Sequence, residues 1–192
     1  MPQIILASAS PRRRELLDQL GIRYHIQAAD LDETPFQKEN PLTYVERIAA
    51  EKSAWVQSRN DLRLPVLAAD TSVVCDDQIL GKPLHEADAV TMLQQLSGRT
   101  HQVYTAVSLR TRTEHLQAVS ITEVTFRPLS LPEIIAYWHT GEPADKAGAY
   151  AIQGLASIFV TAIQGSFSGV VGLPIFETAK LLNQIGIRIL HE

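Results

Sequence analysis

The chain of 192 residues contains a single cysteine, and its charged residues show no excess of positive charge. One cysteine cannot form an intramolecular disulfide, which excludes a disulfide-stabilised secreted domain and is typical of a reducing compartment. A formal net charge of −4 is unlike the basic surface of a nucleic-acid-binding protein. We therefore expect no nucleic-acid partner, and any anionic ligand must be bound by a local group of cations.

Long apolar runs are also missing. No stretch approaches the roughly 18 residues that a membrane-spanning helix needs, and Ser8–Arg14 interrupts the apolar amino terminus, which excludes a signal peptide. With 45% hydrophobic and 20% charged residues, the composition is that of a soluble globular protein with a substantial core. We expect a cytoplasmic protein with no membrane association, folded as one domain over residues 1–192.

Several common catalytic signatures are absent. A P-loop needs serine or threonine after its glycine–lysine pair, but Pro83 follows Lys82, and a nucleophile elbow needs serine where Phe167 stands. The six histidines form no HExxH motif, and one cysteine leaves no cysteine-based zinc site. Nucleophilic catalysis and zinc chemistry are therefore disfavoured.

Strand and helix patterns alternate along the chain, which predicts an α/β protein with a mixed sheet. The segments 101–111 and 119–127 alternate in polarity and are expected to pair as antiparallel neighbours. Ser130 and Glu133 have the spacing of a capping box. Further strands are predicted over 4–7, 22–29, 66–69, 72–75, 79–80 and 157–163. Helices are predicted after Ser10, Asn40 and Ser130, and over 86–96 and 174–184.

The stretch SASPRRRELL, residues 8–17, places three arginines in the first turn of a predicted helix. Ser10 is expected at the amino cap and Pro11 at the first helical position. Because the amino end of a helix carries about half a unit of positive charge, cations there are disfavoured unless an anion offsets them. A strand, a tight loop and a helix follow one another, and this geometry suits phosphate.

Other charged residues also stand where a ligand could meet them. Asp70 ends an apolar strand, where open α/β sheets present residues to ligands, but a turn-starting aspartate explains it equally well. Lys52 lies on the apolar face of the helix after Asn40, where lysine more often extends to water than borders an anion site. Lys82 and Glu33 also fit as solvated loop charges, although carboxylate oxygens suit Mg²⁺ or Mn²⁺. Together these residues fit a polyphosphate with its divalent metal.

An ordered set of motifs resembles the Maf family of nucleoside triphosphate pyrophosphatases over essentially the whole chain. The resemblance implies a two-lobed α/β fold around a deep cleft, similar to that of inosine triphosphate pyrophosphatases, and often dimerisation. It also implies metal-dependent hydrolysis of a nucleoside triphosphate to the monophosphate and pyrophosphate. Beyond SASPRRRELL, the motifs are DETP (32–35), AAEK (49–52), AADTSV (68–73), LGKP (80–83), SGRTHQVYT (97–105), DKAGAYAIQG (145–154) and VVGLP (170–174).

The resemblance also assigns roles to individual residues. The general base falls on Asp70, and the metal-binding acid falls on Glu33, with Asp70 sharing the ion. This agrees with the chemistry, because fixed cations and a metal stabilise the charge that develops on phosphate oxygens and on leaving pyrophosphate. The phosphate-binding residues fall on Ser8, Arg13, Lys52 and Lys82.

Three positions distinguish subgroups of the resembling family. Arg12, Thr71 and Gln153 match the thymidine and uridine triphosphate branch, whereas the 7-methylguanosine triphosphate branch carries tryptophan, glutamine and glutamate there. A primary amide such as Gln153 offers a donor and an acceptor to the N3–H and carbonyl of uracil or thymine. We expect hydrolysis of dTTP and UTP, with modified uridine triphosphates as further candidates. The methylguanosine branch, and a nucleotide-sensing or division-regulating protein without turnover, stay open as alternatives.

Overall fold

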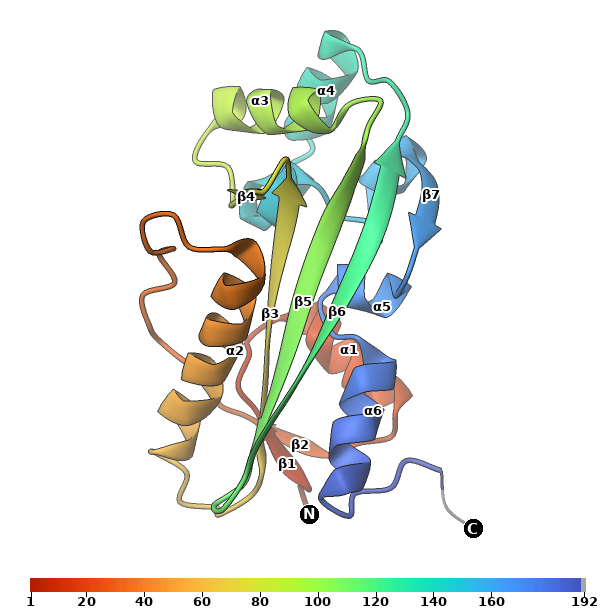
Figure 1. Cartoon of the computed structure of the whole chain (residues 1–192). Helices are drawn as coiled ribbons and strands as arrows, with labels where there is room; N and C mark the ends of the chain where they lie inside the picture. The colour runs from red at the N-terminus through yellow and green to blue at the C-terminus, as the bar shows by residue number, and fades with distance from the viewer. Residues whose placement is uncertain (191–192) are drawn as a thin grey trace.

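Residues 66–75, 100–110 and 115–126 form three long strands. They run from the half of the molecule that contains the two termini into the opposite half (Figure 1). The structure is a computed structural model that describes residues 1–190. The strands are β1 (Ile4–Leu6), β2 (Tyr24–Ile26), β3 (Val66–Cys75), β4 (Gln78–Leu80), β5 (Thr100–Arg110), β6 (His115–Phe126) and β7 (Val160–Gln164). The α-helices are α1 (Pro11–Gln19), α2 (Pro41–Gln57), α3 (Glu86–Leu96), α4 (Leu131–Trp138), α5 (Phe167–Val171) and α6 (Ile175–Gln184). Short 3-10 helices are η1 (Glu142–Asp145), η2 (Ala147–Ala149) and η3 (Leu155–Phe159).

The strands form one seven-stranded mixed sheet in the order β2-β1-β3-β5-β6-β7, with β4 paired to β3. Strand β1 is parallel to both β2 and β3. The pairs β3–β5, β5–β6 and β6–β7 are antiparallel. The predicted pairing of 101–111 with 119–127 is present, with Ala106 opposite Val119. The predicted α/β class with a mixed sheet is therefore confirmed.

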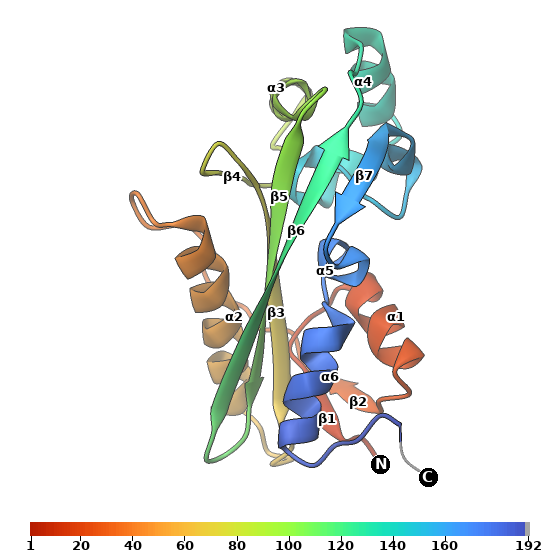
Figure 2. The ribbon, with the colours of Figure 1, turned by 45° about the vertical axis from the view of Figure 1, so that its right-hand side comes forward.

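Helices cover both faces of this sheet. Helix α2 lies on one face, and α1 and α6 lie on the other (Figure 2). Helices α3 and α4 gather around the ends of the long strands that lie farthest from the two termini (Figure 1). No helix within residues 1–190 is long and apolar enough to cross a membrane.

The local sequence explains why α2 forms and how it packs. Its amino cap, Asn40, accepts a hydrogen bond from the amide of Leu42 at 2.9 Å, which satisfies one of the free donors of the first turn. Val45, Ile48 and Val56 recur at helical spacing and are completely buried against the sheet. This packing fixes the rotation of the helix about its axis. Side chains on the same face, including Lys52, therefore point toward the sheet.

Some sequence-based expectations were wrong. Strand β3 does not end near Asp70 but continues to Cys75, because β5 pairs with it without a break through Val74. The capping box is not formed, since the Ser130 side chain makes no cap hydrogen bond and Glu133 instead binds the Arg127 guanidinium at 2.9 Å.

The predicted strand over 157–163 was correct only in its second half. Residues Leu155–Phe159 form the 3-10 helix η3, because the Glu142 carboxylate accepts the amides of Leu155 at 2.9 Å and Ala156 at 3.3 Å. Helix α5 was not predicted, and the strand expected over 22–29 is limited to β2. These differences arise from contacts between distant segments.

We expect Gly148→Ala to lower the free energy of unfolding by about 2–4 kcal/mol, because two costs add. Gly148 has a φ of +68°, and an added Cβ would lie 2.8 Å from Cγ1 of Val73 in β3. Gly21→Ala is the matched control, since Gly21 has a φ of +67° with no atom within 4 Å of an added Cβ. The control should lose only about 1–2 kcal/mol. Urea denaturation measures both variants, and equal losses would contradict the packing argument.

Candidate active site

A cleft with a volume of about 1090 Å³ opens between the two halves of the molecule. Its walls come from the loop after β1, the acidic loop of residues 30–39, the middle of β3, the turn after β4, and η1 and η2. A cleft of this size admits a small organic ligand. The predicted site residues that line it are Ser8, Arg12, Arg13, Glu33, Lys52, Asp70, Thr71 and Lys82.

The pairing of β3 explains why its middle is accessible to a ligand. Strand β1 pairs with β3 only at Val66 and Leu67, and β4 pairs with it only at 73–75. Residues 68–72 therefore pair with β5 alone and leave their other edge to the cleft. Because successive side chains of a strand point to opposite faces, Asp70 meets α2 while Thr71 meets α1.

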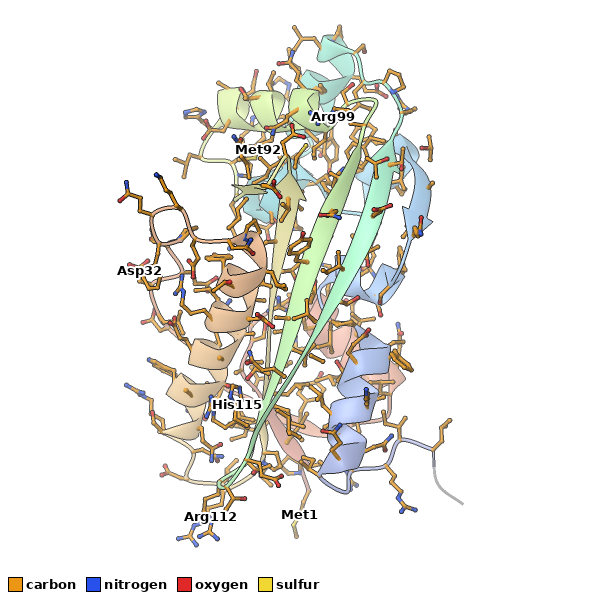
Figure 3. The ribbon with its side chains drawn as sticks, in the orientation of Figure 1. Met1, Asp32, Met92, Arg99, Arg112 and His115 are labelled. Carbon is orange, nitrogen blue, oxygen red and sulfur yellow. The ribbon has the colours of Figure 1, made fainter. Side chains whose placement is uncertain are left out.

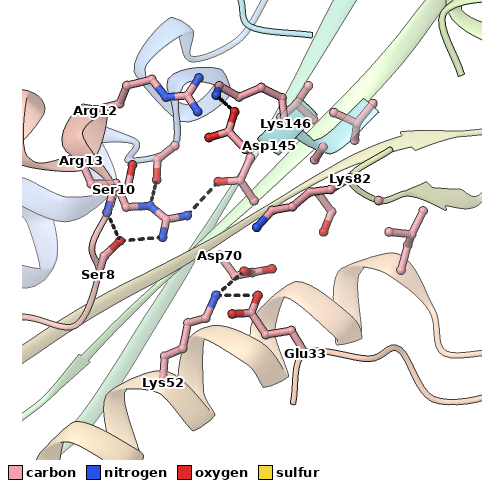
Figure 4. Close-up of a pocket in the computed structure, with 18 of the residues that line it drawn as sticks. Ser8, Ser10, Arg12, Arg13, Glu33, Lys52, Asp70, Lys82, Asp145 and Lys146 are labelled. Atoms are coloured by element: carbon pink, nitrogen blue, oxygen red, sulfur yellow. Dashed lines mark hydrogen bonds and ion pairs between the residues drawn. The ribbon is translucent and has the colours of Figure 1, made fainter. Parts of the chain in front are cut away.

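Lys52 links the two predicted carboxylates of the site. Its Nζ lies 2.8 Å from Oδ1 of Asp70 and 2.9 Å from Oε2 of Glu33 (Figure 4). Lys52 is only 8% exposed and Asp70 only 6% exposed. The lysine does not extend to water and borders the cleft, whereas its binding of an anion stays a prediction. Burial of these charges is tolerated because they are paired.

Arg13 is held by neutral acceptors. Its Nε donates to the Gly172 carbonyl at 2.8 Å, Nη1 to Ser8 Oγ at 3.2 Å and Nη2 to Thr71 Oγ1 at 3.4 Å. Burial lowers the pKa of the Arg13 guanidinium from its ordinary value, because water is removed from the charged group. No carboxylate within residues 1–190 forms an ion pair with Arg13. Its positive charge is therefore available to an anionic ligand.

The loop before α1 is organised around Ser8. Ser10 occupies the predicted cap position, but its side chain makes no cap hydrogen bond. Instead, the Ser10 amide donates to Ser8 Oγ at 3.2 Å, and the same hydroxyl accepts from Arg13. The expected capping by Ser10 is therefore absent, and the short serine side chain of the loop orients the arginine.

The turn after β4 and the segment that joins η1 to η2 bring further charged groups to the cleft. Lys82 points toward Asp70, and Arg12 extends toward Asp145 and Lys146, which form an ion pair (Figure 4). Lys82 forms no ion pair with any described residue of the chain. Asp145 and Lys146 were not predicted as site residues. The sequence signal that could have indicated them is their position as the first two residues of the DKAGAYAIQG motif.

Gln153 is the predicted site residue that the structure does not bring to the cleft. Its side chain is exposed, whereas its neighbour Ile152 is buried and lines the cleft wall. Gln153 therefore lies beside the site and outside its lining.

The donor set of the acidic side suits a hard cation. Glu33 and Asp70 are the two carboxylates that meet at Lys52, and no group of three or more His, Cys, Asp or Glu side chains suited to a metal occurs within residues 1–190. Mg²⁺ is commonly bound by one or two carboxylates together with substrate phosphates and water. The residues present fit this mode of binding.

We expect Lys52→Met to destabilise the protein by about 3 kcal/mol at neutral pH, because Asp70 would remain buried without a counter-charge. Lys82→Met is the matched control, since Lys82 is exposed and should alter stability little. Adding Asp70→Asn to Lys52→Met should recover much of the loss, as measured by urea denaturation. If the double variant were no more stable than Lys52→Met, the charge-pairing explanation would be wrong.

Comparison with known proteins identifies the family. A dTTP/UTP pyrophosphatase from Methylococcus capsulatus is 54% identical over 185 residues, which cover 96% of this chain and 92% of the relative. Another from Nitrosomonas europaea is 52% identical, covering 97% of this chain and 96% of the relative. The crystal structure of protein VC0702 from Vibrio cholerae covers 97% of this chain and 96% of its own, with a TM-score of 0.52 and 11% identity, and shares the fold alone. Residues 3–185 match the family described as Maf-like protein, and the chain belongs to this family.

Proposed function

We propose that the chain is a nucleoside triphosphate pyrophosphatase that hydrolyses dTTP and UTP to the monophosphate and pyrophosphate. The observation that carries this proposal is the meeting of a buried carboxylate, Asp70, with the cations Lys52, Arg13 and Lys82 in one cleft. The names of relatives about half identical to the chain support the substrate assignment. Modified uridine triphosphates have the same hydrogen-bonding edge and are proposed as further substrates.

In the proposed reaction, Asp70 acts as the general base. Lys52 binds Oδ1 of Asp70, and Oδ2 has no hydrogen-bond donor in the described part of the chain. Oδ2 takes a proton from a water molecule, whose oxygen attacks the α-phosphorus as the bond to the bridging oxygen of the β-phosphate breaks. The pyrophosphate leaves with the electron pair of that bond. Arg13 and Lys82, together with the Ser8 hydroxyl, bind the phosphate oxygens on which negative charge increases.

Glu33 and Asp70 are proposed to hold a divalent cation, Mg²⁺ or Mn²⁺. When bound, such a cation neutralises negative charge on the phosphate oxygens. Lys52 contacts both carboxylates and keeps their oxygens directed toward one point of the cleft. The acidic loop and β3 would thus each contribute one ligand.

The base is proposed to lie near Arg12, with Thr71 and Gln153 as the other specificity residues. The Thr71 hydroxyl is within 3.4 Å of Arg13 Nη2 and accepts from Thr105 at 3.0 Å, so it stands beside the phosphate-binding residues. The side chain of Gln153 is exposed, and we propose that it turns into the cleft when a base is bound.

The remaining proposals concern the state of the protein in the cell. A single domain over residues 1–192 and a cytoplasmic location agree with the composition. A homodimer is supported by apolar side chains that are exposed on neighbouring elements. These include Ile158 of η3, Ile163 of β7 and Phe167 of α5, which are 62%, 37% and 49% exposed.

Asp70→Asn should reduce the release of pyrophosphate from dTTP by about 10²–10⁴-fold, because the amide cannot accept the proton from water. Asp77→Asn, in the turn between β3 and β4, is a matched control that should retain full turnover and stability. Both variants are assayed with Mg²⁺ and with Mn²⁺. Wild-type turnover by Asp70→Asn would exclude the proposed base.

Gln153→Glu should reduce kcat/KM for dTTP and UTP about tenfold, because the substitution removes a donor and places a carboxylate near the base carbonyl. Gln164→Glu at the end of β7 is the control and should leave kcat/KM unchanged. The assay panel includes 7-methylguanosine triphosphate, on which the alternative branch of the family acts. Binding of triphosphates without turnover by the wild-type protein would instead favour a nucleotide-sensing function.

A further inference from the structure

We propose that Arg47 is a positioning residue, which fixes the acidic loop on α2 so that Glu33 faces Asp70 and Lys52. The proposal rests on the proposed function, in which Glu33 serves the reaction. Arg47 does not line the cleft, and it acts only through the loop that it binds.

Leu31, which packs against a cluster that includes Val45 and Ile48 of α2, is the last apolar anchor of the acidic loop before Glu33. Every side chain from Asp32 to Lys38 is exposed, and the segment contains neither helix nor strand. Asp32 itself points away from the sheet at the outer side of the loop (Figure 3). Its Oδ1 accepts the amide of Thr34 at 2.9 Å, a local turn that shapes the loop without attaching it to the protein. Beyond Leu31, the position of the loop therefore depends on contacts made by polar groups.

Arg47 supplies most of these contacts from one guanidinium group. Nε lies 2.6 Å from Oε1 of Glu39 and Nη2 lies 2.7 Å from Oε2, so the carboxylate is held by two parallel bonds. Nη2 also donates to the carbonyl of Thr34, the residue after Glu33, at 3.3 Å. The guanidinium carbon lies 3.9 Å from the centre of the Phe36 ring. Three points of the loop are thus attached to one side chain.

Helix α2 in turn holds Arg47 in place. Glu51, one turn further along the helix, accepts from Nη1 of Arg47 at 3.2 Å. Tyr44, one turn earlier, donates its hydroxyl hydrogen to the Glu33 carbonyl at 2.8 Å. The same helix carries Lys52, which binds the Glu33 carboxylate. Successive turns of α2 therefore hold Glu33 in three ways. Tyr44 binds its backbone carbonyl, Arg47 binds the segment that follows it, and Lys52 binds its carboxylate.

The geometry predicts that the guanidinium shape matters as well as the charge. A lysine at position 47 would keep one positive charge but could not bind both oxygens of Glu39, contact Thr34 and cover Phe36 at the same time. Loss of these bonds would free the loop to sample other positions, and Glu33 would face Asp70 only part of the time. Because outer residues that orient metal ligands affect binding about 10–100-fold, the effect should be measurable.

The experiment compares Arg47→Met and Arg47→Lys with a matched control, Arg59→Met. Arg59 lies after α2, stacks on Trp55 at 4.1 Å and donates to its carbonyl at 3.1 Å, without contacting the acidic loop. Exchange of the Phe36 amide hydrogen, which is donated to Glu39 Oε2 at 2.9 Å, is measured without metal or nucleotide. Calorimetry with Mn²⁺ alone then gives the metal affinity, and steady-state assays give kcat and KM for dTTP.

For Arg47→Met, we expect exchange of the Phe36 amide to be about tenfold faster, with Mn²⁺ affinity and kcat/KM each reduced about tenfold. Arg47→Lys should resemble Arg47→Met, and Arg59→Met should match the wild type. If Arg47→Met does not fold, Tyr44→Phe removes one loop contact while keeping the ring and should show the same changes to a smaller degree.

Unchanged exchange in Arg47→Met would overturn the proposal, as would faster exchange with wild-type Mn²⁺ affinity and turnover. Failure of the proposed function has a different signature. In that case the wild-type protein would release no pyrophosphate, or Glu33→Gln would turn over substrate like the wild type, whatever the exchange rates of the loop.

Discussion

The bond from the Lys52 ammonium group to the Asp70 carboxylate holds the acidic side of the cleft together. Both groups are almost completely buried, and charges in such an environment are stable only when they are paired. Lys52 supplies the compensating charge and shares it with Glu33. The acidic loop, α2 and β3 are consequently joined at one nitrogen atom.

Around this bond, the two faces of the sheet carry different charged groups. The acidic loop and the middle of β3 bring carboxylates to one side of the sheet, while α1 and the loop before it bring Arg13 to the other. Arg13 is oriented by a carbonyl and two hydroxyls, none of which reduces its charge. One side is therefore suited to a cation and the other to an anion, as a metal–polyphosphate ligand requires.

Secondary-structure elements could be predicted where neighbouring residues in the sequence determine them. Asn40 and Pro41 start α2, and the burial of Val45, Ile48 and Val56 follows from their spacing. The roles expected for residues of the cleft came from the resemblance to the family, and the structure brings most of these residues together while leaving Gln153 outside. The features that could not be predicted depend on contacts between residues far apart in the sequence. Strand β3 continues past Asp70 because β5 pairs with it, and Glu142 bends Leu155–Phe159 into a 3-10 helix.

The uninterrupted pairing of β3 with β5 also limits how the molecule can move. Their register is continuous from Val66 to Val74, so the strand that carries Asp70 crosses both halves as one stiff element. Hinge bending beneath the cleft would break this ladder of hydrogen bonds. Any closure over a bound ligand is therefore left to segments outside the sheet, of which η1 and η2 border the opening. The Asp70 carboxylate, the proposed general base, stays fixed while its surroundings adjust.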